Sequence, residues 1–109
     1  MDANEYQKRA MRTHNKDVYE IKDMLNNAAL GLTGESGEFA DHIKKMLFQG
    51  HEIDKTYLIN ELGDILWYCS LACTATGVAM GEVMKNNIAK LEKRYPVEFE
   101  RELSINRKN

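Results

Sequence analysis

The sequence is poor in the residues that interrupt or cross-link a chain. It has one proline, Pro96, and two cysteines, Cys69 and Cys73. Two thiols without further ligands do not make a structural zinc site, and a disulfide across one helical turn is geometrically awkward, so we expect both cysteines to be reduced. No apolar run approaches the roughly 20 residues that cross a bilayer, and the polar N-terminus has no signal-peptide core. These absences predict a cytoplasmic protein without a membrane partner.

The sequence also lacks a strong charge of either sign. Its 15 basic and 17 acidic residues give a net charge of -2, so electrostatics gives no reason to expect nucleic-acid binding. A length of 109 residues predicts one domain spanning 1–109. A domain of this size buries only a modest core, and association between copies is one way to complete it.

Strand patterns are absent, whereas apolar residues recur at helical spacing along most of the chain. The clearest helix covers residues 55–76, with Asp54 as its N-cap and Gly77 as its stop; we expect it to be the most buried element. A last strong helix covers 78–94 and ends before Pro96. The apolar side chains that we expect to face inward on this last helix are Val83, Ile88 and Leu91. The sequence therefore predicts an all-α fold of four or five helices packed as a bundle, with a charged tail.

The stretch "GLTGESGEFADHIKK", residues 31–45, has three glycines at intervals of three. It does not match a nucleotide-binding P-loop, because no lysine follows a second glycine at the required spacing and the neighbouring acids would repel phosphate. No strand precedes it, which also excludes a dinucleotide fingerprint. We interpret Gly31, Gly34 and Gly37 as small residues on a helix, leaving room for another helix or a ligand.

Two pairs of acids share one spacing, i and i+3, which places each pair on one helix face. They are Glu35 with Glu38, and Glu61 with Asp64. The second pair lies in an apolar helix, and no lysine or arginine occurs from Thr56 through Met84. Two acid pairs facing each other would need cations, and an oxygen-only ligand set favours Mg²⁺ or Mn²⁺. A di-iron site is not predicted, because the Glu-x-x-His spacing is absent. The alternative is ordinary surface charge.

The end of the last helix, "KNNIAKLEKRYP", carries candidate phosphate-binding groups. Lys90 and Arg94 can bind phosphates, and Asn87 can orient a phosphate or a bound water. The alternative is a solvated basic helix end favoured by the helix dipole. Tyr68 and Trp67 follow Asp64 and could flank a base by stacking, although aromatic residues at helical spacing usually belong to a core.

In their order along the chain, "GLTGESGEFADHIKK", "NELGDILWY" and "NNIAKLEKRYP" resemble the MazG-like nucleotide pyrophosphohydrolases of the all-α NTP pyrophosphatase superfamily. The resemblance covers residues 28–96 and rests on E-x-x-E followed by E-x-x-D. It implies a four-helix-bundle subunit that forms a homodimer or a dimer of dimers with shared sites. It also implies hydrolysis of a nucleoside triphosphate to a monophosphate and pyrophosphate.

Carried over by position, the resemblance makes four acids the ligands of Mg²⁺: Glu35, Glu38, Glu61 and Asp64. The implied substrate-side residues are Asn87, Lys90, Arg94 and Tyr95. The segment before residue 28 matches no motif and is a candidate for base recognition. We assign the role of water-activating base to Glu38, since a carboxylate not saturated by metal can take that proton.

The sequence leaves the substrate open. A non-canonical or surplus deoxynucleotide is one prediction, and a phosphoribosyl-linked nucleotide of histidine synthesis is a less favoured one. A non-enzymatic alternative is a helical oligomerising regulator or a nucleotide sensor, which would also account for the apolar helix and the balanced charge.

Overall fold

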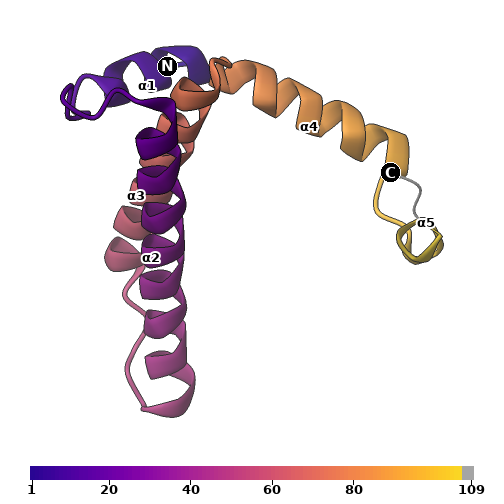
Figure 1. The fold of residues 1–109 in the computed structure, drawn as a ribbon. Coiled ribbons are helices and arrows are strands. Elements are labelled where there is room, and N and C mark those ends of the chain that lie inside the picture. The colour runs from indigo at the N-terminus through magenta and orange to yellow at the C-terminus, as the bar shows by residue number, and fades with distance from the viewer. Residues whose placement is uncertain (107–109) are drawn as a thin grey trace.

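The computed structural model describes residues 1–106, which form five α-helices and no strand (Figure 1). The helices are α1 (Ala3–Met11), α2 (Ile21–Phe48), α3 (Lys55–Thr76), α4 (Met80–Arg94) and α5 (Arg101–Ile105). The all-α prediction is confirmed, and α5 lies in the charged tail. Residues 107–109 of the predicted domain lie outside the described residues.

Helices α2 and α3 form a long antiparallel hairpin, which Figure 1 shows as the upright part of the molecule. The 28 residues of α2 continue without a break through Gly31, Gly34 and Gly37, which confirms that these glycines are helical. Gly50 ends the helix with a φ of 72°, and the Asp54 carboxylate accepts a hydrogen bond from the Tyr57 N–H to start α3. Local capping chemistry thus sets both ends of the turn.

His42 fastens the start of α3 to α2. Its Nε2 accepts a hydrogen bond of 3.1 Å from the Asp54 N–H, and its ring stacks on Tyr57 with centroids 4.9 Å apart. These contacts tie the N-terminal end of α3 to the C-terminal part of α2, one turn beyond the acid pair of that helix. His42 therefore helps to set the register of the hairpin.

The hydrophobic core lies at the end of the hairpin near α1. Met24 and Ala28 of α2 pack there with Leu71 and Ala75 of α3. Partly buried residues complete this cluster: Met11, Val18, Trp67, Tyr68 and Ala72. Helix α3 contributes the largest number of buried side chains among the described helices, as its composition predicts.

The two cysteines of α3 are free thiols, in agreement with the prediction. Cys73 is buried and Cys69 partly so. Burial raises the pKa of the Cys73 thiol, which keeps it protonated and makes it a packed apolar side chain.

Helix α4 leaves the hairpin at an elbow. Gly77 ends α3 in the left-handed conformation, and α4 has no side-chain cap of its own. Its first N–H groups are instead capped by α1: the Met80 N–H donates to Gln7 Oε1 at 2.7 Å, and the Gly81 N–H donates to Asn4 Oδ1 at 2.8 Å. Because α1 holds the start of α4 from outside the hairpin, α4 projects away from it (Figure 1).

Within residues 1–106, no helix by itself is long and apolar enough to cross a membrane. Helices α3 and α4 reach that length and composition only as a pair, and they meet at a bend of 99°.

The predicted inward packing of α4 is wrong for the single chain. Val83, Ile88 and Leu91 are 44%, 52% and 40% exposed. The physical reason is the elbow, which directs α4 away from the hairpin, so that beyond its start none of the other described helices covers its apolar face. The chain alone therefore does not close the predicted four-helix bundle over its described residues (Figure 1).

Candidate active site

Three of the predicted acids meet between the two helices of the hairpin. Glu35 and Glu38 come from α2 and Glu61 comes from α3, and each offers a carboxylate oxygen within 4.8 Å of the others. The i, i+3 spacing aims the two α2 side chains the same way, as expected. Glu61 is only 6% exposed, Glu35 is half-buried, and Glu38 is exposed. We call these three residues the carboxylate cluster.

The carboxylate cluster carries more negative charge than its surroundings neutralise. Contact with Glu61 raises the pKa of Glu38, and contact with Glu35 followed by burial raises the pKa of Glu61. A proton on one carboxyl group can be shared with a neighbouring carboxylate, and a second negative charge is unfavourable there, so both effects of close approach raise these pKa values. Lys45, further along α2, forms an ion pair of 3.0 Å with Asp41.

The carboxylate cluster fits a divalent metal. Oε2 of Glu35 and Oε2 of Glu61 are buried and have no hydrogen-bond partner among the described residues. Buried acceptors without a donor are costly, whereas a cation bound by them would satisfy both their charge and their lone pairs. Hard oxygen ligands without histidine or cysteine match the preferences of Mg²⁺ and Mn²⁺.

Asp64, the fourth predicted ligand, lies beside the carboxylate cluster and is exposed. Its negative charge contributes to the raised pKa values of Glu38 and Glu61. Together with Glu35, Trp67 and Tyr68 it lines an open cavity of about 350 Å³. The structure thus brings all four predicted acids to one region of the hairpin, with three in mutual contact distance and the fourth on the cavity wall.

The wall of this cavity includes the two aromatic residues singled out in the sequence. The Trp67 ring meets the Tyr68 ring edge to face, with centroids 5.0 Å apart. The Trp67 indole N–H donates to the Ala10 carbonyl at 3.2 Å and to Thr13 Oγ1 at 2.8 Å. The segment before residue 28 therefore reaches the cavity by orienting Trp67, a role that no sequence motif indicated.

Tyr57 is a residue near the site that the sequence analysis missed. Its pKa is raised by burial and by the charges of Glu61 and Glu38, so its hydroxyl remains protonated beside the carboxylate cluster. Tyr57 precedes Glu61 by four residues, and that spacing on α3 was the available signal.

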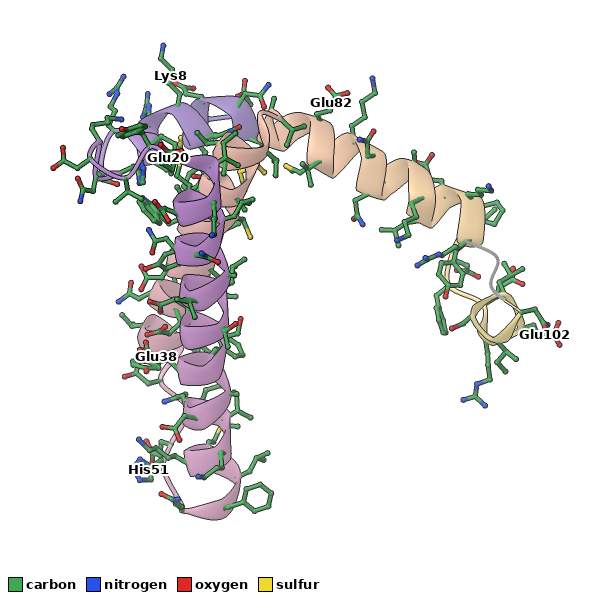
Figure 2. All side chains as sticks on the ribbon, in the orientation of Figure 1. Lys8, Glu20, Glu38, His51, Glu82 and Glu102 are labelled. Carbon is green, nitrogen blue, oxygen red and sulfur yellow. The ribbon has the colours of Figure 1, made fainter. Side chains whose placement is uncertain are left out.

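The predicted phosphate-binding residues lie elsewhere in the single chain. Asn87 and Lys90 are exposed on α4, whereas Arg94 and Tyr95 are half-buried at its end. There the centroids of the Tyr95 and Phe99 rings lie 5.2 Å apart. Figure 2 shows Glu38 well down the hairpin, on the far side of the elbow from α4. The chain therefore does not bring these residues to its own acids, and their role toward a substrate stays a prediction.

Comparison with known proteins supports the resemblance seen in the motifs. The model of the MazG nucleotide pyrophosphohydrolase domain matches residues 24–99, a range that contains the carboxylate cluster, Asp64 and all of α4. The Gene 37 protein of Mycobacterium phage L5 is 32% identical over 74 residues, which are 64% of this chain and 65% of the phage protein. The match thus spans just under two thirds of that relative's length. No solved structure matches the chain.

Proposed function

This chain belongs to the MazG nucleotide pyrophosphohydrolase family, and from that membership we propose that it hydrolyses a nucleoside triphosphate to a nucleoside monophosphate and pyrophosphate. The substrate we favour is a non-canonical or surplus deoxynucleotide. The observation that carries the proposal is the carboxylate cluster, whose unpartnered buried oxygens adjoin an aromatic-walled cavity. The proposal includes Mg²⁺ as the cofactor, with Mn²⁺ as a substitute.

Glu35, Glu38, Glu61 and Asp64 would hold the metal. When bound, it supplies positive charge that neutralises the carboxylates and the triphosphate. Glu61 is the least exposed of these acids, which makes it the most firmly placed ligand. The four acids differ in exposure, so they can differ in role.

Glu38 is our candidate for the general base. It is the exposed member of the carboxylate cluster, and its neighbour Glu61 raises its pKa, which makes its carboxylate a better proton acceptor. In the proposed reaction a water oxygen bonds to the α-phosphorus and its proton goes to the Glu38 carboxylate. The bond from the α-phosphorus to the bridging oxygen breaks, and its electron pair leaves with pyrophosphate.

The cavity beside the acids gives the nucleoside a place to bind. Its volume of about 350 Å³ lies at the lower end of small-molecule sites, and its walls combine aromatic rings with the carboxylates of Glu35 and Asp64. In this proposal, Tyr68 contacts the nucleoside by stacking, while the triphosphate extends toward the carboxylate cluster.

A second copy of the chain would complete this site. One face of α4 exposes Val83, Met84, Ile88 and Leu91, and α3 exposes Ile59, Leu62 and Leu66. A monomer seldom leaves so many large apolar side chains in water, whereas pairing of two copies would cover them. In such a homodimer or homotetramer, Asn87, Lys90, Arg94 and Tyr95 of one copy would supply the phosphate-binding side of another copy's site.

A panel of canonical and modified nucleoside triphosphates, incubated with Mg²⁺ or with a chelator, tests the proposal. We expect metal-dependent release of pyrophosphate and a nucleoside monophosphate from at least one nucleotide. Release of orthophosphate, or no turnover across the panel, would refute the proposed reaction. Nucleotide binding without turnover would favour the nucleotide-sensor alternative.

A further inference from the structure

The three glycines of α2 have the same spacing but different surroundings. A Cβ atom built at Gly31 would overlap the Tyr68 ring at Cδ1, Cε1 and Cζ. A Cβ at Gly34 or at Gly37 would meet no atom of the described residues within 4 Å. Of these three glycines, only Gly31 would have its Cβ against another described residue, and that residue belongs to the cavity wall.

The Tyr68 ring is confined from a second direction by Trp67. The two rings meet at an interplanar angle of 84°, and two hydrogen bonds from the Trp67 indole N–H, to Ala10 and Thr13, fix the indole in turn. Tyr68 thus lies between the backbone of α2 at Gly31 and an indole anchored by the end of α1. Any side chain at position 31 would have to push the tyrosine ring out of this position.

The position of Gly31 connects this contact with the acids. Gly31 precedes Glu35 by one helical turn, so both lie on the same face of α2. Tyr68 follows Asp64 by one turn of α3, and Glu35, Asp64 and Tyr68 line the same cavity. A displacement of the Tyr68 ring would therefore alter the cavity directly beside two of the predicted metal ligands.

We infer that Gly31 is a positioning residue of the nucleotide site, since its missing side chain provides the space in which Tyr68, braced by Trp67, faces the substrate beside Glu35 and Asp64. This inference rests on the proposed function for the identity of the ligand. It assigns to Gly31 no contact with the substrate; the residue acts through Tyr68.

The primary test compares Gly31→Ala with Gly34→Ala. Both substitutions replace glycine by alanine in the same helix, and both improve helix propensity, so the contact with Tyr68 is the main difference between them. For Gly31→Ala we expect KM for the nucleotide to rise about tenfold, a change typical of losing one stacking contact, with kcat altered less. For Gly34→Ala we expect no change in KM. Equal KM values for the two variants would overturn the inference.

Variants at position 68 test whether Gly31 acts through the tyrosine ring. In a Tyr68→Phe background the ring remains, so Gly31→Ala should still raise KM about tenfold. In a Tyr68→Ala background the ring is gone, and Gly31→Ala should have no further effect. If Gly31→Ala raises KM by the same factor in the Tyr68→Ala background, the inference is refuted. If Gly31→Ala alone does not fold, recovery of folding in Gly31→Ala/Tyr68→Ala supports it, and failure to recover overturns it.

Fluorescence separates this inference from the proposed reaction. Trp67 is the only tryptophan in the sequence, so the protein's tryptophan emission reports the environment of that ring alone. Gly31→Ala should shift this emission, whereas Gly34→Ala should leave it as in the unmodified protein. If Gly31→Ala shifts the emission but the unmodified protein turns over no nucleotide, the missing turnover refutes the proposed reaction. The shift still supports the positioning of Tyr68 by Gly31. Absence of any shift would refute the positioning, whatever the activity.

Discussion

The α2–α3 hairpin and α4 depart from the usual distribution of side chains in opposite ways. The hairpin buries an acid, Glu61, next to two further carboxylates, whereas α4 exposes apolar side chains such as Ile88. A buried, unpaired charge and an uncovered apolar face are both unfavourable in an isolated chain. We therefore expect each to be a binding surface: the hairpin would bind a cation, and α4 would bind an apolar surface. The contrast separates the hairpin, which would hold the metal, from α4, which would mediate association and bring its phosphate-binding residues to another copy's site.

Removal of divalent metal should have the largest effect, because all four predicted ligands on the hairpin would lose their cation at once. We expect chelation to abolish hydrolysis and to expose the repulsion within the carboxylate cluster. The raised pKa values of Glu38 and Glu61 mean that the folded chain binds more protons than the unfolded chain. Their contribution to the free energy of unfolding is therefore fully present below the ordinary glutamate pKa of about 4.3 and is lost as the pH rises through the raised values.

Thermal unfolding at a series of pH values, with chelator and with saturating Mg²⁺, measures this effect. Asp41 has a lowered pKa because of Lys45 and contributes the opposite slope, so the comparison is made against Glu61→Gln, which keeps that pair. The chelated protein should lose stability relative to Glu61→Gln as the pH rises, and Mg²⁺ should remove the loss. If the stabilities of the two proteins in chelator change in parallel with pH, repulsion within the carboxylate cluster does not contribute as proposed.

Substitution of one ligand should have the next largest effect. Loss of a group that merely supports a metal ligand costs about 10–100-fold in affinity or activity. Glu61→Gln removes a buried ligand, so we expect more than about 100-fold lower kcat/KM. Glu82→Gln is the matched control, because Glu82 is an exposed acid on α4 (Figure 2). Similar activity losses in both variants would show that the hairpin has no special role.

The third prediction concerns assembly through α4. Ile88→Asp places a charge on the apolar face, and we expect the oligomer to dissociate, at least halving the mass measured by light scattering. Asn86→Asp introduces the same side chain on the opposite face of α4 and should leave the mass unchanged. Since Ile88 is already 52% exposed, the stability of the single chain should change by less than about 0.5 kcal/mol. An unmodified protein that is monomeric would refute the proposed role of α4.

The smallest effect should come from the elbow that separates the two regions. Gln7→Ala removes the cap on the Met80 N–H, and loss of a helix cap costs about 1 kcal/mol. Chemical denaturation measures this loss, with Lys8→Ala, an exposed neighbour on α1, as the control. If the two variants are equally stable, the hydrogen bonds of Gln7 do not hold α4 in place.

The parts of the fold that could be predicted are those encoded by neighbouring residues. The predicted helix 55–76 matches α3 at both ends, because Asp54 caps its start and Gly77 adopts the left-handed conformation at its end. The approach of Glu35, Glu38 and Glu61 could likewise be anticipated, since an i, i+3 pair must share a helix face and both pairs lie on adjacent helices. Their assignment as metal ligands remains a prediction.

The direction of α4 could not be predicted in this way. Its caps come from Gln7 and Asn4, which are 73 and 77 positions away in the sequence. The amphipathic pattern of α4 shows only that one face requires a partner, and the same pattern suits a partner in the same chain or in another. The expectation that Val83, Ile88 and Leu91 face inward failed for this reason.

The sequence by itself determined the all-α class, both ends of α3 and the two i, i+3 pairs of acids, because caps and side-chain periodicity act within one or two turns. Tertiary structure decided which of three equivalent glycines touches an aromatic ring, which acid is buried, and where α4 points. Those outcomes depend on contacts between residues far apart in the chain: Tyr68 against Gly31, Glu61 against Glu35, and α1 against the start of α4. A local pattern shows that a side chain needs a partner, whereas the packing of the helices decides which residue that partner is.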